Sequence, residues 1–135
     1  ICVGFLEEII FRGFLFLGMA EKNIKSAILV SSVTFGIGHI VNLLNGKPVL
    51  ETLLQIVFAT AVGFVLVMLF HKGKSLIPCI IFHSINNALS AISDEEASLK
   101  FFGSVENELY ISVGFSLIIC LLYLAALLHN FKSEE

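Results

Sequence analysis

Five long apolar segments, separated by short polar breaks, set the strongest limit on how this chain can fold. The segments run approximately over Ile1–Ala20, Ile24–Leu44, Val49–Phe70, Leu76–Ile92 and Leu109–Phe131. Each is close to the length of about 17–25 residues that a helix needs to cross a bilayer. Short breaks favour antiparallel neighbours. We therefore predict an all-α, polytopic transmembrane bundle with about five membrane helices.

The composition indicates the same class. Hydrophobic residues make up 57% of the 135 residues and charged residues 14%, whereas about 25% of a soluble domain is charged. This predicts a multi-pass integral membrane protein in contact with lipid, and we expect a bacterial plasma membrane. The net charge of −3 and the lack of a basic patch argue against a nucleic-acid partner.

One transmembrane domain is expected to occupy residues 1–135, with a motif-bearing core at 4–90 and a C-terminal helix at about 109–131. The chain starts with Ile rather than Met and has no basic leader, so we expect upstream helices to precede it. The one long connector, 93–108, is acidic, but apolar residues interrupt it. We expect a short interfacial helix there.

Lysine residues are distributed unequally between the two ends of the predicted helices. The first, third and C-terminal breaks carry Lys22, Lys25, Lys72, Lys74 and Lys132, and the other breaks carry Lys47 and Lys100. Cytoplasmic loops are usually enriched in Lys and Arg, so the C-terminus is predicted to be cytoplasmic. The motif-bearing helix ends described next would then lie on the outer side, unless the first helix extends upstream or the orientation is inverted.

The first apolar segment contains three ionisable residues, Glu7, Glu8 and Arg12. At the centre of a membrane helix each costs roughly 2.5–3.5 kcal/mol, so such residues are functional candidates. Glu8 and Arg12 are four residues apart and can pair on one helix face, whereas Glu7 should point toward a different neighbour. Two carboxylates in different surroundings can supply distinct acid and base roles. A helix-packing ion pair is the alternative, and it leaves Glu7 unexplained.

Polar residues also recur in the second and fourth segments. Gly36 and Gly38 should permit close helix approach, and His39 follows them with Asn42 close behind. His83 and Asn87 are four residues apart and share a helix face, where two hydrogen-bond donors could stabilise a developing oxyanion. Each group could instead be an interhelical hydrogen-bonding patch.

The predicted depths of these residues agree with one another. At about 1.5 Å per residue, Glu7 lies about 9 Å from the start of its segment. His39 and Asn87 each lie roughly 8 Å from the ends of theirs, and these three ends face the same side in an alternating bundle. We therefore predict one intramembrane polar site that contains Glu7, His39 and Asn87, with His83 a turn deeper.

A carboxylate, a histidine and two oxyanion donors can activate water and hydrolyse an amide bond. No cofactor is then expected. The alternative is zinc held by Glu7, His39 and His83, because catalytic zinc sites use such His₂Glu sets. The chain lacks an HExxH motif, so a metal site would be assembled from three helices.

At these residues the chain is similar to the CPBP family, which comprises CAAX proteases and bacteriocin-processing proteins and is also called the Abi family. The family motifs EExxxR, FxxxH and HxxxN match Glu7–Arg12, Phe35–His39 and His83–Asn87, in order and one per helix. The resemblance covers about Gly4 to Ser90. It implies an intramembrane endopeptidase of packed helices with an internal polar cavity.

The resemblance also implies residue roles and a substrate class. Glu7 and His39 would activate water, His83 and Asn87 would bind the oxyanion, and Glu8 with Arg12 would order the site. A metal-free, glutamate-dependent mechanism fits this set, because Asn87 is a poor zinc ligand. The substrate would be a peptide or lipidated protein, as in CAAX processing. A bacteriocin self-immunity protein acting by binding, and a proton-coupled transporter, are the competing functions.

Overall fold

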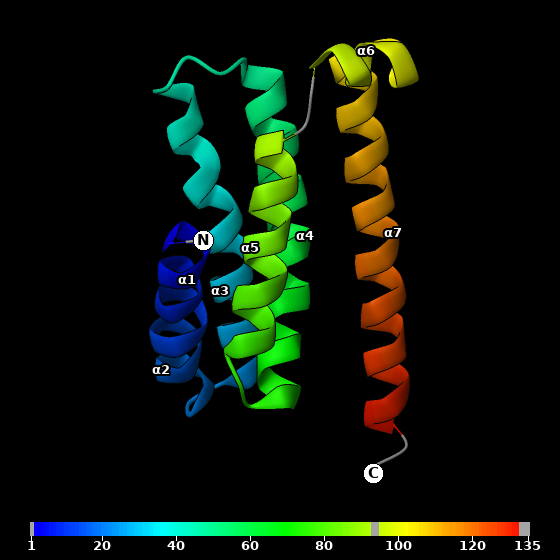
Figure 1. The fold of residues 1–135 in the computed structure, drawn as a ribbon. Helices are drawn as coiled ribbons and strands as arrows, with labels where there is room; N and C mark the ends of the chain where they lie inside the picture. Colours follow the sequence, from blue (N-terminus) through cyan, green and yellow to red (C-terminus); the bar gives the residue numbers. More distant parts are fainter. Residues whose placement is uncertain (1, 93–94, 133–135) are drawn as a thin grey trace.

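The computed structural model describes residues 2–92 and 95–132. Over these ranges the secondary structure is helical, which confirms the all-α prediction. Figure 1 shows the helices, most of them running along one bundle axis. Their bounds are α1 Cys2–Glu8, π-helix η1 Ile9–Phe16, α2 Leu17–Ala20, α3 Ile24–Ile37, 3₁₀ helix η2 Gly38–Leu43, α4 Val49–Gly73, α5 Ile77–Ile92, α6 Glu95–Phe102 and α7 Val105–Lys132.

The first apolar segment forms a helical column in three parts, α1, η1 and α2, that follow one another without a break (Figure 1). In the π-helical part each N–H bonds the carbonyl five residues back, which widens the turn. Single-turn π-bulges are frequent at functional sites. This part contains Arg12, and the sequence prediction assumed α-helical geometry throughout.

The second apolar segment changes to a narrower 3₁₀ helix rather than to a wider π-helix. Asn23 is the N-cap of α3, and its side chain accepts a hydrogen bond from the Ser26 amide. The α-helix changes to the 3₁₀ helix η2 at Gly38. The chain then turns through Gly46, whose φ of 80° suits glycine, and α4 begins directly after Pro48.

The central helix of the bundle is α4, which packs against α3, α5 and α7. Gly36 on α3 makes the closest approach: a Cβ there would overlap Thr60 and lie 2.8 Å from the Ile56 carbonyl oxygen. A Cβ at Gly38 would meet nothing within 4 Å. The predicted role in close packing is therefore confirmed for Gly36 and wrong for Gly38, which faces open space.

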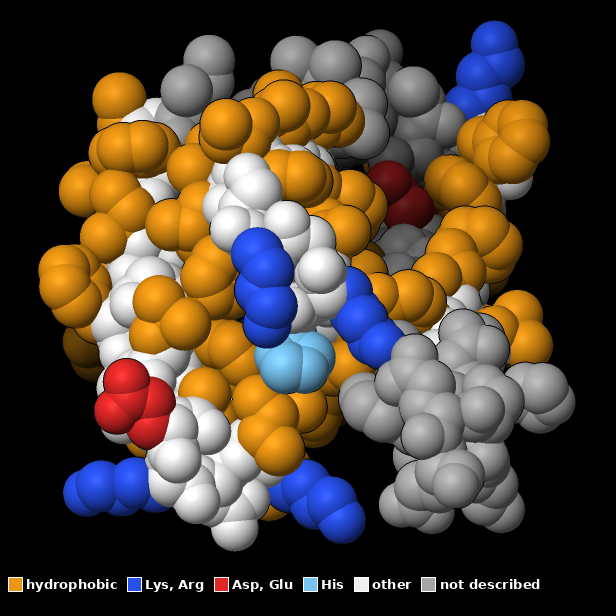
Figure 2. Space-filling model, turned by 90° about the horizontal axis from the view of Figure 1, so that it is seen from below, with side chains coloured by type: hydrophobic (Ala, Val, Ile, Leu, Met, Phe, Trp, Pro, Cys, Tyr) orange, Lys and Arg blue, Asp and Glu red, His pale blue; other side chains and the backbone are white. Residues whose placement is uncertain are grey.

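Away from this contact, a hydrophobic core fills the end of the bundle where η1, α3, α4 and α5 meet. Its buried members are Phe16, Ala27, Leu66, Val67, Phe70 and Cys79. Figure 2 views that end: Lys side chains surround a His on an otherwise largely hydrophobic face. The opposite end carries the turn before α4 and the helix α6, which confirms a helix within the long connector (Figure 1).

Three described helices are long and apolar enough to cross a membrane: Ile24–Leu43, Val49–Gly73 and Glu106–Tyr123. The chain is a membrane protein, but length and composition support fewer spans than the five predicted from hydropathy. The first helical column carries three ionisable groups, and α5 has 16 residues. At about 1.5 Å per residue α5 is about 24 Å long, which is shorter than a hydrocarbon core of about 30 Å.

Candidate active site

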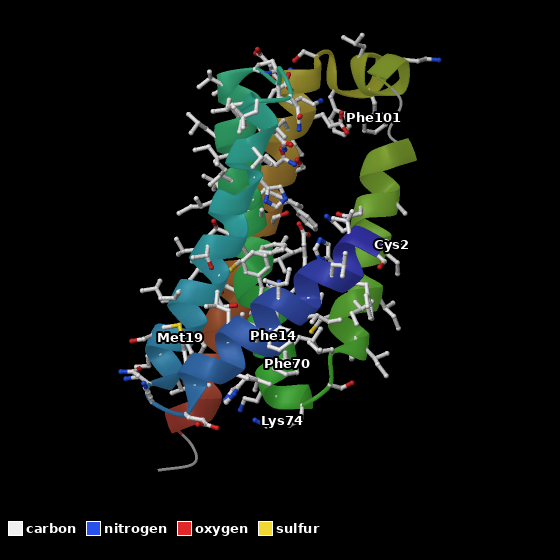
Figure 3. All side chains as sticks on the ribbon, turned by 90° about the vertical axis from the view of Figure 1, so that its left-hand side faces the viewer. Cys2, Phe14, Met19, Phe70, Lys74 and Phe101 are labelled. Carbon is white, nitrogen blue, oxygen red and sulfur yellow. The ribbon has the colours of Figure 1, made fainter. Side chains whose placement is uncertain are left out.

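His83, on α5, lies between the two adjacent glutamates of α1. Its Nδ1 is 2.8 Å from Glu8 Oε1, and its Nε2 is 3.2 Å from Glu7 Oε2. The helix α1 packs against α5, and Figure 3 shows that it meets α5 at an angle near its Cys2 end. The helices are in direct contact at Gly4, where a Cβ would lie 3.4 Å from His83 Cγ, at van der Waals distance.

The expectation that Glu7 and Glu8 face different neighbours is wrong in this structure. Both reach the same imidazole, one at each ring nitrogen. The physical reason is the size of the ring: its two nitrogens lie on separate edges and bridge the angle of about 100° between successive helix positions. The two surroundings still differ, because the Glu8 side chain is fully buried and the Glu7 side chain is 31% exposed.

Arg12 completes the buried side of this cluster. Its Nη1 donates to Glu8 Oε1 at 3.0 Å, which confirms the predicted ion pair. Its Nη2 donates to the Gly63 carbonyl of α4 at 3.3 Å. The guanidinium carbon lies 4.4 Å from the centre of the Phe35 ring, a cation–π distance. Arg12 therefore ties the glutamate helix to α3 and α4.

Phe35 also separates the two candidate histidines. Its ring packs edge-on against His39 at 5.7 Å and against His83 at 5.4 Å between centroids. His39 Nδ1 lies 3.2 Å from the Phe35 carbonyl oxygen. A carbonyl oxygen only accepts hydrogen bonds, so Nδ1 carries the hydrogen and Nε2 of a neutral His39 is left as an acceptor.

A cavity of about 560 Å³ adjoins this cluster. His39, His83 and Asn87 all line it, so the structure brings these three predicted residues to one space. Glu7, which was predicted to share this site, does not line the cavity, but it contacts His83, which does. Glu8 and Arg12 are buried on the other side of the cluster. The other lining residues are Phe35, Asn42, Lys47, Glu51, Gln55, Phe58, Ala59, Val62, Asn86, Glu108, Leu109 and Ser112.

Sequence reasoning did not single out two features of this site. Phe35 entered only as the first position of a motif, yet its ring contacts Arg12, His39 and His83. Gln55 was treated as part of an apolar segment, although a polar residue in the middle of such a segment is the signal that could have found it. Its side chain pairs with Asn42 in the cavity wall.

The alternative zinc set of Glu7, His39 and His83 is not assembled here. Both nitrogens of His83 face carboxylates, and His39 lies against the same Phe35 ring as His83. Within residues 2–92 and 95–132, no group of three or more His, Cys, Asp or Glu side chains is placed to hold a metal ion. As placed, these residues do not fit a three-ligand zinc centre.

A family model described as type II CAAX prenyl endopeptidase Rce1-like matches residues 1–89. The chain belongs to the Rce1-like family. The match covers all three motifs and agrees with the resemblance inferred from them. Comparisons with curated proteins and with solved structures found no match. The helices α6 and α7 lie outside the Rce1-like region.

Proposed function

We propose that this chain is an intramembrane endopeptidase of the CAAX prenyl type, in which Glu7 activates the attacking water. The difference in exposure between the two glutamates carries the proposal. A general base has to touch the water from which it takes a proton. Glu7 is 31% exposed beside His83, whereas Glu8 is fully buried and paired with Arg12.

The contacts of His83 support a proton-holding role for the pair it makes with Glu7. Glu8 is the ion-pair partner of Arg12, and an ionised carboxylate only accepts hydrogen bonds. His83 Nδ1, which faces Glu8 Oε1, therefore carries a hydrogen. The remaining contact, from Nε2 to Glu7 Oε2, then needs a proton on one of its two atoms. That proton belongs to the pair, and the pair could pass a proton from water to the leaving amine.

His39 and Asn87 line the cavity beside this pair. The Nε2 acceptor of His39 suits a water molecule that approaches a peptide carbonyl, and the Asn87 amide can donate to the oxyanion that forms. The oxyanion role expected of His83 requires that its Nε2 contact with Glu7 opens when the substrate enters. Glu8 and Arg12 position His83 from the buried side.

The experiment measures cleavage of a farnesylated CAAX peptide by the protein reconstituted in lipid. Wild type is compared with Glu7→Gln and Glu8→Gln, each with and without a strong zinc chelator. Loss of a general base should lower kcat by about 10²–10⁴-fold in Glu7→Gln. Wild-type cleavage should continue in the chelator.

Other outcomes are equally informative. Full activity in Glu7→Gln removes Glu7 as the base. Cleavage lost to the chelator and restored by zinc replaces the glutamate mechanism with a metal mechanism. If the wild-type protein binds the peptide but never cleaves it, the protease proposal is contradicted. That outcome would favour a binding role, such as bacteriocin self-immunity.

A further inference from the structure

We propose that the paired amides of Asn42 and Gln55 form a subsite that binds the backbone of an extended peptide substrate. The inference rests on the proposed function. Asn42 Nδ2 donates to Gln55 Oε1 at 2.7 Å, which joins η2 to α4. Both side chains line the cavity that also contains His39, His83 and Asn87.

A bonded pair of carboxamides keeps one free acceptor and further free donors. In this pair, Asn42 Oδ1 can still accept and Gln55 Nε2 can still donate. The same holds if the hydrogen bond runs in the opposite direction. A peptide group offers one N–H and one C=O, which is the complementary set. An extended peptide gains affinity in the same way when it pairs with the edge of a β-sheet.

The 3₁₀ geometry of η2 places Asn42 on the same face of the helix as His39. His39 and Asn42 are three residues apart in a 3₁₀ helix, which has about three residues per turn, so both face the cavity. At a rise of about 2.0 Å per residue they are about 6 Å apart along the axis. An extended peptide advances about 3.3 Å per residue, so the subsite lies about two residues from the cleaved bond.

The test removes the pair without removing its volume. The variant Asn42→Leu/Gln55→Met replaces both partners with apolar groups of similar shape, a change that can be nearly neutral for folding. The control is Asn45→Leu/Leu53→Met, which introduces the same two side chains at exposed positions that do not line the cavity. The substrates are farnesylated CAAX peptides with one backbone amide N-methylated at a time.

We expect one N-methylated peptide to show KM raised about three- to tenfold in wild type and in the control, which corresponds to one lost hydrogen bond. In Asn42→Leu/Gln55→Met the same N-methylation should have no further effect, because its partner is gone. For the unmodified peptide, that variant should already show KM raised by a similar factor, because the same hydrogen bond is lost. If every N-methylation costs the same in all three proteins, the pair only joins helices and the inference is overturned.

A binding measurement separates this inference from the proposed function. Glu7→Gln protein, alone and combined with the pair variant, is titrated in detergent with the same fluorescently labelled peptides. If wild type does not cleave, but N-methylation weakens binding only when the pair is present, the subsite stands and the protease proposal fails. If the peptides neither bind nor are cleaved, both proposals fail.

Discussion

At the scale of single residues, the site and the helices around it combine buried polar atoms that are hydrogen-bonded with buried polar atoms that are not, such as Glu8 Oε2 and Arg12 Nε. Two neighbouring serines on α3 show the contrast. Ser31 Oγ donates to the Phe11 carbonyl of η1 at 2.8 Å. Ser32 Oγ is also buried, but it has no hydrogen-bond partner. The Ser31 contact joins the π-helical part of the first column to α3.

Alanine at each serine should therefore have opposite consequences. Ser31→Ala should lower the free energy of unfolding by about 0.5–1.5 kcal/mol, because it removes a hydrogen bond between helices. Ser32→Ala should be neutral or stabilising, because it removes a hydroxyl that is buried without a partner. Thermal unfolding in detergent compares them, and equal losses in both variants would contradict this assignment.

Among the residues of the site, Arg12 should be the one whose loss lowers the free energy of unfolding most. Arg12→Met leaves the buried Glu8 without its cation and should cost about 3–5 kcal/mol of folding free energy. The double variant Glu8→Gln/Arg12→Met no longer buries that charge, so it should recover part of the loss. A double variant that unfolds as easily as Arg12→Met would show that packing, rather than charge, explains the cost.

At the scale of elements, the sequence predicted the helices well and their internal geometry poorly. Val49–Phe70 was expected and Val49–Gly73 forms a helix, because hydropathy and turn residues mark where an apolar helix begins and ends. The π-helix η1 and the 3₁₀ helix η2 were not predicted. Their hydrogen-bond offsets depend on tertiary contacts, such as the Ser31 bond to Phe11, that a hydropathy pattern does not contain.

The same limit applies to the candidate site. Motif spacing predicted the Glu8–Arg12 pair, because residues four apart share a helix face. The predicted depths placed Glu7, His39 and Asn87 at one level, with His83 a turn deeper. In the structure His39, His83 and Asn87 line one cavity, whereas Glu7 contacts His83 without lining it. Motif spacing could not predict that Glu7 and Glu8 share His83, since this depends on how closely α5 approaches α1 at Gly4.

The close packing of α3 against α4 at Gly36 leads to a testable prediction about stability. Gly36→Ala should destabilise the protein by about 1–3 kcal/mol, because the new methyl group overlaps Thr60 and forces the helices apart. Gly38→Ala is the matched control and should be tolerated, since its methyl group enters open space. Unfolding temperatures test the pair, and similar losses at both positions would show that the Gly36 contact is not limiting.

At the scale of the whole molecule, the lysine distribution predicts the orientation of the bundle. The turn between α2 and α3 lies at the end that is expected to be cytoplasmic, and the turn before α4 lies at the opposite end (Figure 1). Cavity-lining residues Lys47 and Glu51 belong to that opposite end. The predicted orientation therefore places the end of the cavity that Lys47 and Glu51 line on the outer side, whereas a prenylated cytosolic substrate would approach from the inner side.

Cysteine labelling in intact cells decides between these orientations. In a Cys2→Ala background, an impermeant maleimide should label Asn45→Cys directly and Glu21→Cys only after permeabilisation, because α3 and η2 span the membrane between the two exposed positions. The reverse pattern would turn the cavity toward the cytoplasm. Direct labelling of both would mean that this helix does not cross.

The position of α7 has a consequence for how such a protein can diversify. Glu108, Leu109 and Ser112 of α7 form part of the cavity wall, but α7 lies outside the region that the family model matches. The motif residues come from α1, η1, α3, η2 and α5, and the helix α7 packs on α4. One wall can thus be exchanged while the reacting groups stay in place. Chimeras that carry a different final helix should therefore inherit new substrate preferences and keep the old chemistry.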